Sequence, residues 1–309
     1  MRSVQAQRRY KKEEAITALL FISPWIIGFL VFTAGPMLAS IYFSLTEYNV
    51  LQPPEWVGLA NYKEILTNDP LFWKSLYNTV YYTALYVPLH LAVALGLALL
   101  LNLNVRGVPF WRTFFYLPSI TPVVAVAILW RWILNPNSGI LNRFLASVGL
   151  PAPGWTTDPN WMKPALVLMS LWGAGGAMLI YLAGLKNIPR ELYEAAQIDG
   201  AGRWARFLHI TLPMISGVMF FNLVISIIAS LQTFAQPVLL FNTSEGGGST
   251  TNDAVLLYIV YLFRQAFRYF HMGYASALAW IIFVIIVIFT IIQFRLSQRW
   301  VYYEGGEQK

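Results

Sequence analysis

The sequence predicts an all-α membrane protein with six membrane-spanning helices. Of its 309 residues, 57% are hydrophobic and only 11% are charged, with a mean hydropathy of +0.55. Soluble domains carry about 25% charged residues. The apolar residues gather in six long runs, and a bilayer core about 30 Å thick needs roughly 20 of them per helix. The chain is therefore expected to cross a lipid bilayer six times.

The expected spans lie within a transmembrane domain of residues 15–297. They are approximately Ala15–Phe43, Leu76–Leu103, Thr113–Leu134, Pro164–Leu185, Leu212–Phe241 and Tyr274–Leu296. The first run follows the charged stretch RRYKKEE, but it is too long for a secretory signal and lacks a small-residue cleavage site. It is expected to remain as a helix after a basic segment of residues 1–14.

The distribution of positive charge predicts the orientation. With six spans, segments 1–14, 104–112, 186–211 and 297–309 share the side of the N-terminus, and together with Arg295 they hold fourteen of the 21 Lys and Arg residues. Positive residues accumulate on the cytoplasmic side of membrane proteins. Both termini, including a tail of residues 298–309, are therefore expected in the cytoplasm. This asymmetry accounts for the net charge of +7, so nucleic acid is not expected as a partner.

The three outer connections differ in character. Residues 44–75 are rich in Pro, Asn and aromatic residues, which predicts a compact segment with an interfacial helix; a docking surface there stays open beside ordinary packing. Residues 135–163 contain the turn signals NPNSG and PAPGW. The last connection carries SEGGGSTTND, flexible by composition, and then LLYIVYLFRQAFRYF. The spacing of Arg264 and Arg268 predicts a helix lying at the membrane surface.

The cytoplasmic loop of residues 186–211 is unusually polar for this chain. Pro189 suits the first turn of a helix, Glu191 suits its positive N-terminal end, and Gly200 suits its C-terminal end. These residues predict a short helix from about Pro189 to Asp199. Further along, three apolar residues recur at helical spacing and predict a second short amphipathic piece: Trp204, Phe207 and Leu208.

The two pieces would form a helix-turn-helix elbow beneath the membrane. Leu192, Ala195 and Ala196 give the first piece a small, smooth face that another protein could approach closely. An amphipathic loop resting on lipid headgroups is the alternative.

A sequence pattern distinguishes the two readings. Glu194-Ala195-Ala196, followed by Gly200 and later by Ile210-x-Leu212-Pro213, resembles the EAA signature of permease subunits of ABC importers. The resemblance extends over nearly the whole chain and looks closest to sugar-importer permeases of the maltose-transporter type. It implies the type I ABC importer permease fold. The large outer-loop insertion of the maltose permease has no counterpart here.

The resemblance also implies partners and a location. In that family the EAA loop is the coupling helix, seated in a cleft of the ATP-hydrolysing subunit. The contact residues would be Glu194, Ala195, Ala196, Asp199 and Gly200. The implied partners are a second and different permease subunit, two copies of an ABC ATPase and an extracytoplasmic solute-binding protein. The implied location is the cytoplasmic (inner) membrane of a bacterium or archaeon.

The chain lacks chemistry of its own for driving transport. It contains no G-x-x-x-x-G-K-[ST] motif, so ATP and Mg are expected on the partner ATPase, and no cofactor or catalytic residue is expected here. None of its fourteen acids lies in the middle of a span, as ion-coupled carriage would ordinarily require. The lone His90 within span two is expected to be a packed, hydrogen-bonding residue. Three scattered histidines and no cysteine offer no metal site.

A polar stripe on span five suggests where a solute could bind. Four of its polar residues share one helical face: Asn222, Ser226, Ser230 and Thr233. Hydroxyl and amide groups with aromatic faces suit a sugar site, whereas hydrogen bonding to a partner subunit is an equal alternative. The resemblance favours the sugar site, because it aligns Ser226, Ser230 and Thr233 with sugar-binding positions and brings Ser119, Trp172 and Gly173 beside the cavity. Gly175 and Gly176 are expected to permit close helix packing.

The expected function is the transmembrane subunit of an ATP-driven ABC importer, forming the translocation pathway for a sugar or oligosaccharide. Three alternatives stay open. An importer for a non-sugar solute such as glycerol phosphate would need an Arg or Lys near the cavity to bind the phosphate group. An ion-coupled secondary carrier would work alone, and a membrane scaffold would move no solute.

Overall fold

The computed structural model describes residues 2–103, 106–241 and 253–302, with only the backbone of residues 2–13 and 15. The side chains of the basic N-terminal segment, most of the SEGGGSTTND stretch and the end of the tail lie outside these residues. Apart from two short strands, the described elements are helices, which confirms the all-α prediction. Their contacts divide the chain into two units, residues 1–67 with 265–281 and residues 68–264 with 282–309.

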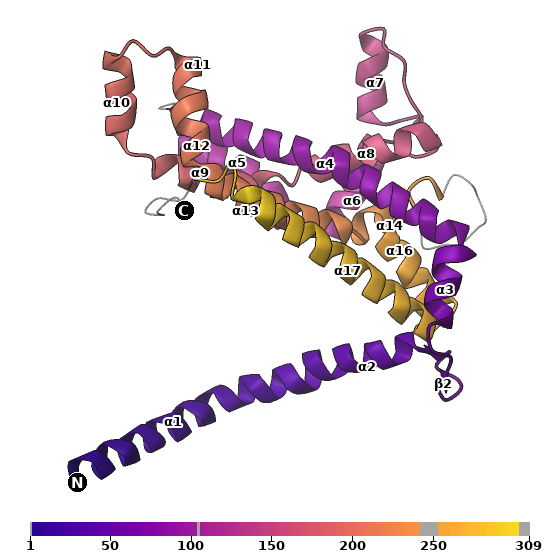
Figure 1. The fold of residues 1–309 in the computed structure, drawn as a ribbon. Helices are drawn as coiled ribbons and strands as arrows, with labels where there is room; N and C mark the ends of the chain where they lie inside the picture. Colours follow the sequence, from indigo (N-terminus) through magenta and orange to yellow (C-terminus); the bar gives the residue numbers. More distant parts are fainter. Residues whose placement is uncertain (1, 104–105, 242–252, 303–309) are drawn as a thin grey trace. The chain divides into compact units, whose positions relative to one another are not determined.

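The first unit begins with a long continuous helix (Figure 1). It consists of α1 (Arg2–Phe29), the π-helical turn η1 (Leu30–Ala34) and α2 (Gly35–Ser44). Pro36 has no backbone N–H and interrupts the regular hydrogen-bond ladder, and the N–H of Gly35 instead donates to the carbonyl oxygen of Leu30. The unit also contains the following elements: β1 (Thr46–Glu47), β2 (Glu55–Trp56), α3 (Ala60–Thr67), most of η3 (Arg264–Arg268) and the start of α17 (Met272–Ser297).

The segment after α2 folds compactly, as its composition predicts. β1 and β2 pair antiparallel, with Thr46 opposite Trp56. The side-chain amide of Asn61 donates to the carbonyl oxygens of Ser44 and Thr46 at 3.0 and 2.9 Å, so α3 closes over the hairpin. The N–H of Gly273 donates to the carbonyl oxygen of Tyr48 at 3.1 Å and joins α17 to the same segment.

The second unit contains the remaining helices, whose bounds follow. They are α4 (Pro70–Asn102), α5 (Val108–Ile120), α6 (Val123–Ile133), α7 (Ile140–Ser147), α8 (Pro159–Leu171), α9 (Gly175–Lys186), α10 (Arg190–Ile198), α11 (Arg203–Arg206), η2 (Phe207–Thr211), α12 (Leu212–Met214), α13 (Ser216–Leu231), α14 (Ala235–Phe241) and α16 (Tyr258–Phe263).

Helices α4, α9 and α13 form the centre of the second unit. Ala94 and Ala98 of α4 are fully buried, and their small side chains let α9 approach with Met178 and Tyr181. Ile215, at the start of α13, closes this cluster. The close approach that these small side chains permit stabilises the packing through van der Waals contact.

Three helices of the described residues are long and apolar enough to cross a membrane by themselves. They are residues 16–44, α4 and α17. Three further helix pairs qualify together but bend at a short break: α5 with α6 by 99°, α8 with α9 by 49°, and the Arg203–Met214 segment with α13 by 64°. Apolar runs three, four and five are therefore bent pairs and not single straight helices.

Each bend has a local cause in the sequence. Thr121 and Pro122 separate α5 from α6: proline cannot donate to the helix ladder and forces the preceding residue into an extended conformation. Gly173 lies in the break before α9. Because it has no side chain, its backbone is less restricted and can leave the helical conformation at this point. Pro213 similarly precedes the break at Ile215.

The helix predicted at the membrane surface is packed within the protein. Residues 258–268 are helical, as expected. However, Tyr258, Val260 and Tyr261 of α16 are buried at 0–3% exposure, and the N–H of Tyr258 donates to the hydroxyl of Thr79 in α4 at 2.8 Å. The Tyr258 ring also packs edge-on against Phe72 of α4, with centroids 5.9 Å apart, so this helix contacts a neighbouring helix.

Candidate solute cavity and coupling elbow

A cavity of about 300 Å³ lies in the second unit, where α4 meets the breaks between α5 and α6 and between α8 and α9. The end of α13 and the start of α14 complete its wall. The two broken helix pairs leave room at this point, because their chain directions change where a continuous helix would have filled the space. Small-molecule sites occupy concave pockets of about this size.

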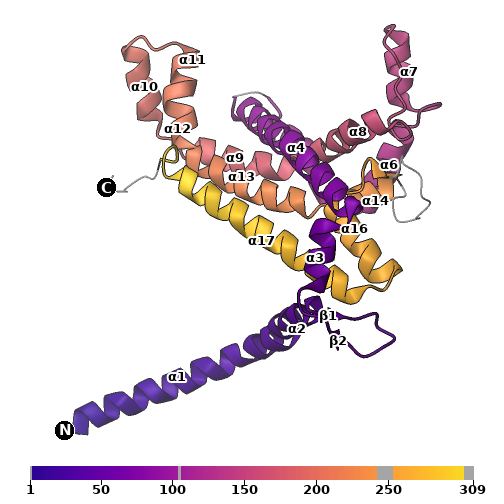
Figure 2. The same ribbon diagram turned by 45° about the vertical axis from the view of Figure 1, so that its right-hand side comes forward.

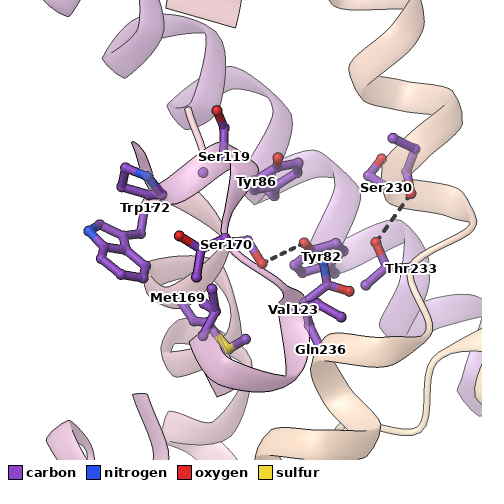
Figure 3. A pocket seen from close by; sticks show the side chains of 15 residues that line it. Tyr82, Tyr86, Ser119, Val123, Met169, Ser170, Trp172, Ser230, Thr233 and Gln236 are labelled. Atoms are coloured by element: carbon purple, nitrogen blue, oxygen red, sulfur yellow. Dashed lines mark hydrogen bonds between the residues drawn. The ribbon is translucent and has the colours of Figure 1, made fainter. Parts of the chain in front are cut away.

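The cavity wall is polar, aromatic and uncharged. Figure 3 shows Tyr82 between Ser170 and Thr233, with its hydroxyl donating to the Ser170 oxygen at 2.9 Å. The Tyr82 and Tyr86 rings stack with centroids 5.2 Å apart. Among the described residues, those lining the cavity are Tyr82, Tyr86, Pro118, Ser119, Thr121, Val123, Val126, Met169, Ser170, Trp172, Gly173, Ala229, Ser230, Thr233 and Gln236, and none of these carries a formal charge.

Five residues proposed from the sequence meet in this cavity, although they come from three separate apolar runs. They are Ser119, Trp172, Gly173, Ser230 and Thr233. Trp172 is 39% exposed and packs edge-on against Trp130, with ring centroids 6.2 Å apart. This contact leaves part of the indole accessible from the cavity.

The other two proposed residues, Asn222 and Ser226, do not line the cavity. Both are buried on the same face of α13, at 4% and 7% exposure. The Asn222 amide donates to the carbonyl oxygen of Val218 at 3.2 Å. The polar stripe is therefore buried within the chain, and the cavity reaches only the C-terminal end of the stripe, at Ser230 and Thr233.

Sequence reasoning missed five polar residues of the wall: Tyr82, Tyr86, Thr121, Ser170 and Gln236. The two tyrosines lie four residues apart on one face of α4, a spacing that could have identified them. A tyrosine within an apolar run looks like ordinary packing, however, and Ser170 becomes recognisable only because it accepts the Tyr82 hydrogen bond. His90, one turn beyond Tyr86, is buried and lies 3.2 Å from the Tyr86 hydroxyl, as expected of a packed histidine.

The predicted elbow forms as two short antiparallel pieces. Figures 1 and 2 both show α10 beside α11, joined by a tight turn. The turn has the two hydrogen bonds of a Schellman motif. The N–H of Ala201 donates to the carbonyl oxygen of Ala196 at 2.8 Å, and the N–H of Gly200 donates to the carbonyl oxygen of Gln197 at 3.1 Å. Gly200 has φ +77°, the left-handed conformation in which an L side chain is strained.

The surface of the elbow is open and partly apolar. Glu194, Ala195 and Asp199 are exposed, while Ala196 is half-buried. Ile198 and Trp204 are 87% and 75% exposed. The Tyr193 hydroxyl meets the Thr211 hydroxyl at 2.9 Å and braces α10 against η2. A braced elbow with large exposed apolar side chains is a surface that another protein can cover.

The structural description shows no cluster of three or more His, Cys, Asp or Glu residues able to hold a metal ion within the ranges it covers. The structure therefore offers two candidate functional features, which are the uncharged cavity among the bent helices and the exposed elbow formed by α10 and α11.

Residues 91–302 match the profile of the family described as binding-protein-dependent transport system inner membrane component. The chain belongs to this family. It is therefore a permease subunit of a binding-protein-dependent ABC transporter and not an enzyme; in such systems the ATPase is a separate subunit.

Curated relatives match this permease along almost its whole length. The probable ABC transporter permease protein YesP of Bacillus subtilis is 46% identical over 96% of this chain and 95% of its own. The lactose transport system permease protein LacF of Rhizobium radiobacter is 33% identical over 94% and 96%.

A solved structure has the same fold. In the crystal structure of a bacterial alginate ABC transporter, in complex with an alginate pentasaccharide-bound periplasmic protein, one chain superposes with a TM-score of 0.80 and 26% identity. The match covers 94% of this permease and 96% of that chain.

Proposed function

We propose that this permease forms half of the translocation pathway of an ATP-driven importer for a sugar or oligosaccharide. The observation that carries the proposal is the cavity wall, which combines hydroxyl, amide and aromatic groups without a formal charge. Hydroxyl and amide groups hydrogen-bond to saccharide hydroxyls, and aromatic faces pack on the apolar faces of sugar rings. The lactose permease and the alginate transporter among the similar proteins support the same substrate class.

The proposed topology has six spans with both termini in the cytoplasm. The three long helices supply spans one, two and six, and the three bent pairs supply spans three, four and five. The positive charge of segments 1–14, 186–211 and 298–309 supports their cytoplasmic location. The membrane is the cytoplasmic (inner) membrane of a bacterium or archaeon.

The elbow is proposed to couple this pathway to ATP hydrolysis. Glu194, Ala195, Ala196, Asp199 and Gly200 would contact one of two ATPase subunits, which bind ATP and Mg. A second, different permease would complete the pathway. It would supply the part of the wall to which Asn222 and Ser226 of this chain do not contribute. An extracytoplasmic solute-binding protein would deliver the saccharide.

Transport then follows from two states that the partners distinguish. ATP binding closes the ATPase pair and favours an outward-facing cavity, and hydrolysis returns the cavity to the inward-facing state. The elbow can transmit this change only if its contact with the ATPase differs in free energy between the two states.

Glycerol phosphate is a weaker candidate substrate. A phosphate group is held best by arginine or by several charged donors, and the described cavity wall offers none. An ion-coupled carrier is disfavoured by family membership, since this family works with a binding protein.

ATP-dependent uptake into proteoliposomes tests the proposal. The permease would be purified in mild detergent with its accompanying subunits, reconstituted, and supplied with the binding protein and a mixture of oligosaccharides. Accumulation of a saccharide that requires ATP supports the function. Accumulation of a non-sugar solute instead, or a permease that reproducibly purifies alone and transports without ATP, would contradict it.

A further inference from the structure

A lysine is held on the outer side of the cavity by two tyrosine rings. The ammonium nitrogen of Lys163, on α8, lies 5.2 Å from the ring centroid of Tyr77 and 5.0 Å from that of Tyr81, both on α4. An ammonium ion at this distance is attracted to the negative face of an aromatic ring. The contact fixes the position of the cation but leaves its charge in place.

Lys163 forms no ion pair with a carboxylate anywhere in the part of the chain that the structure covers. Its neighbour Lys74 differs, because the Lys74 nitrogen lies 3.6 Å from a carboxylate oxygen of Asp253. Lys163 therefore supplies an uncompensated positive charge next to a compensated one. Within this chain the two rings are only partly covered, since Tyr77 and Tyr81 are 63% and 38% exposed.

Two helices agree on where this cation lies relative to the cavity. On α8, Lys163 precedes the cavity residue Ser170 by two helical turns on the same face, or about 10 Å along the axis. On α4, Tyr77 and Tyr81 precede the cavity residues Tyr82 and Tyr86 by five residues, or about 7.5 Å along the axis, on a different face of the helix. Both helices run from an outer connection towards the cytoplasm in the proposed topology, so the cation lies on the entry side.

We infer that Lys163 is a specificity-determining residue that attracts the carboxylate of an acidic saccharide, such as a uronate-containing oligosaccharide, towards the cavity. This inference rests on the proposed sugar-import function. A single lysine is a compact point charge that balances the single charge of a carboxylate, whereas a phosphate group carries a charge of about −1.5 to −2 and would be left partly unbalanced. The uncharged cavity further in then holds the neutral parts of the sugar.

An anchor to lipid headgroups is the competing role for a lysine near a membrane surface. A snorkelling side chain extends towards the headgroups, whereas the Lys163 ammonium is directed onto the rings of a neighbouring helix. The two roles also differ in what they affect. An anchor changes the abundance of the protein or the transport of every substrate equally, while a specificity residue changes the ratio between substrates.

The test compares four importers reconstituted in proteoliposomes with their binding protein: wild type, Lys163→Gln, Lys163→Arg and Lys63→Gln. Each receives one mixture of uronate-containing and neutral oligosaccharides, and the accumulated sugars are quantified by mass spectrometry. Lys63 is an exposed lysine of α3, in the first unit, so its replacement removes an equal charge from the proposed outer side without altering α8 or α4.

The expected result is accumulation of uronate-containing sugars by the wild type, and an about tenfold fall in their initial rate in Lys163→Gln at subsaturating concentration, as expected for a lost charge-assisted contact. Neutral sugars, Lys163→Arg and Lys63→Gln should stay near wild type. Equal loss of both sugar classes in Lys163→Gln, no loss, or a wild type that takes up only neutral sugars would overturn the inference. A wild type that accumulates no saccharide would overturn the proposed function itself.

Discussion

Thr233 presents its hydroxyl at the cavity wall immediately after α13 ends. This hydroxyl donates to the carbonyl oxygen of Ala229 at 3.2 Å, which leaves its lone pairs available to a sugar hydroxyl. We expect Thr233→Val to raise the half-saturating saccharide concentration about two- to tenfold, because one hydrogen bond contributes roughly 0.5–1.5 kcal/mol. Initial uptake rates across a range of saccharide concentrations would measure the change, and ATPase activity at saturation should persist.

Thr290→Val provides the matched control. Thr290 lies on α17, donates to the carbonyl oxygen of Ile286 at 2.8 Å in the same i to i−4 pattern, and does not line the cavity. The substitution removes the same hydroxyl and the same kind of hydrogen bond to a helix carbonyl. If both variants shift the half-saturating concentration equally, Thr233 acts on helix structure and not on the saccharide.

At the scale of single elements, the elbow turn depends on one glycine. Replacing Gly200 by Ala places a Cβ on a residue with φ +77°, which costs about 1–2 kcal/mol in the left-handed region. The expected consequence is a misaimed α10 and a fall in ATP-driven uptake of roughly 5- to 30-fold. Quantitative immunoblotting of membranes would verify that the permease is still inserted.

Gly202→Ala controls for the loss of a glycine in the same turn. Gly202 has an ordinary φ of −68°, and no atom lies within 4 Å of its added Cβ position. Uptake by this variant should stay close to wild type. Normal uptake by Gly200→Ala would remove the basis for a precisely aimed elbow.

The break between α8 and α9 contains a second informative pair of glycines. A Cβ added to Gly175 would lie 2.2 Å from the carbonyl oxygen of Phe115 in α5, so α9 cannot keep its position. Overpacking of this kind costs about 1–3 kcal/mol. We expect Gly175→Ala to lower the midpoint of thermal unfolding in detergent by several degrees, measured by light scattering or tryptophan fluorescence.

Gly176→Ala should be neutral or slightly stabilising, because no atom lies within 4 Å of its added Cβ and alanine favours the helix. The sequence prediction that both glycines permit close packing is thus confirmed for Gly175 and wrong for Gly176. Adjacent helical residues point about 100° apart, so only one of them can face α5. Equal unfolding midpoints for the two variants would contradict the packing seen here.

At the scale of the whole molecule, hydropathy predicts the fold class but not the path of the chain. Apolar runs identify which segments are helical, and capping residues place α10 to within one residue of its predicted bounds. The bends at Pro122 and Gly173 were not predicted, because a run of apolar residues has the same hydropathy whether the helix continues or turns. The cavity forms at those bends, so its full wall could not be derived from composition.

The same distinction separates the candidate residues that the sequence could predict from those that it could not. The face of span five led to Ser230 and Thr233, because residues at helical spacing share a side of one element. Trp172 and Ser119 came from family resemblance, since nothing within their own segments indicates which neighbour they meet. Tyr82 and Ser170 were missed because their significance lies in a contact between residues 88 positions apart.

Thiol accessibility at the cavity tests most directly whether this cavity is the translocation pathway. The chain has no cysteine, so Ser119→Cys, at an exposed position of the cavity wall, would carry the only thiol of this subunit. In reconstituted importer, a membrane-impermeant maleimide should label it from the cytoplasmic side without nucleotide and from the outer side when a non-hydrolysable ATP analogue is bound. Saturating saccharide should slow the labelling in either state. Labelling that ignores both nucleotide and saccharide, or no labelling from either side, would contradict the claim that this cavity is the translocation pathway.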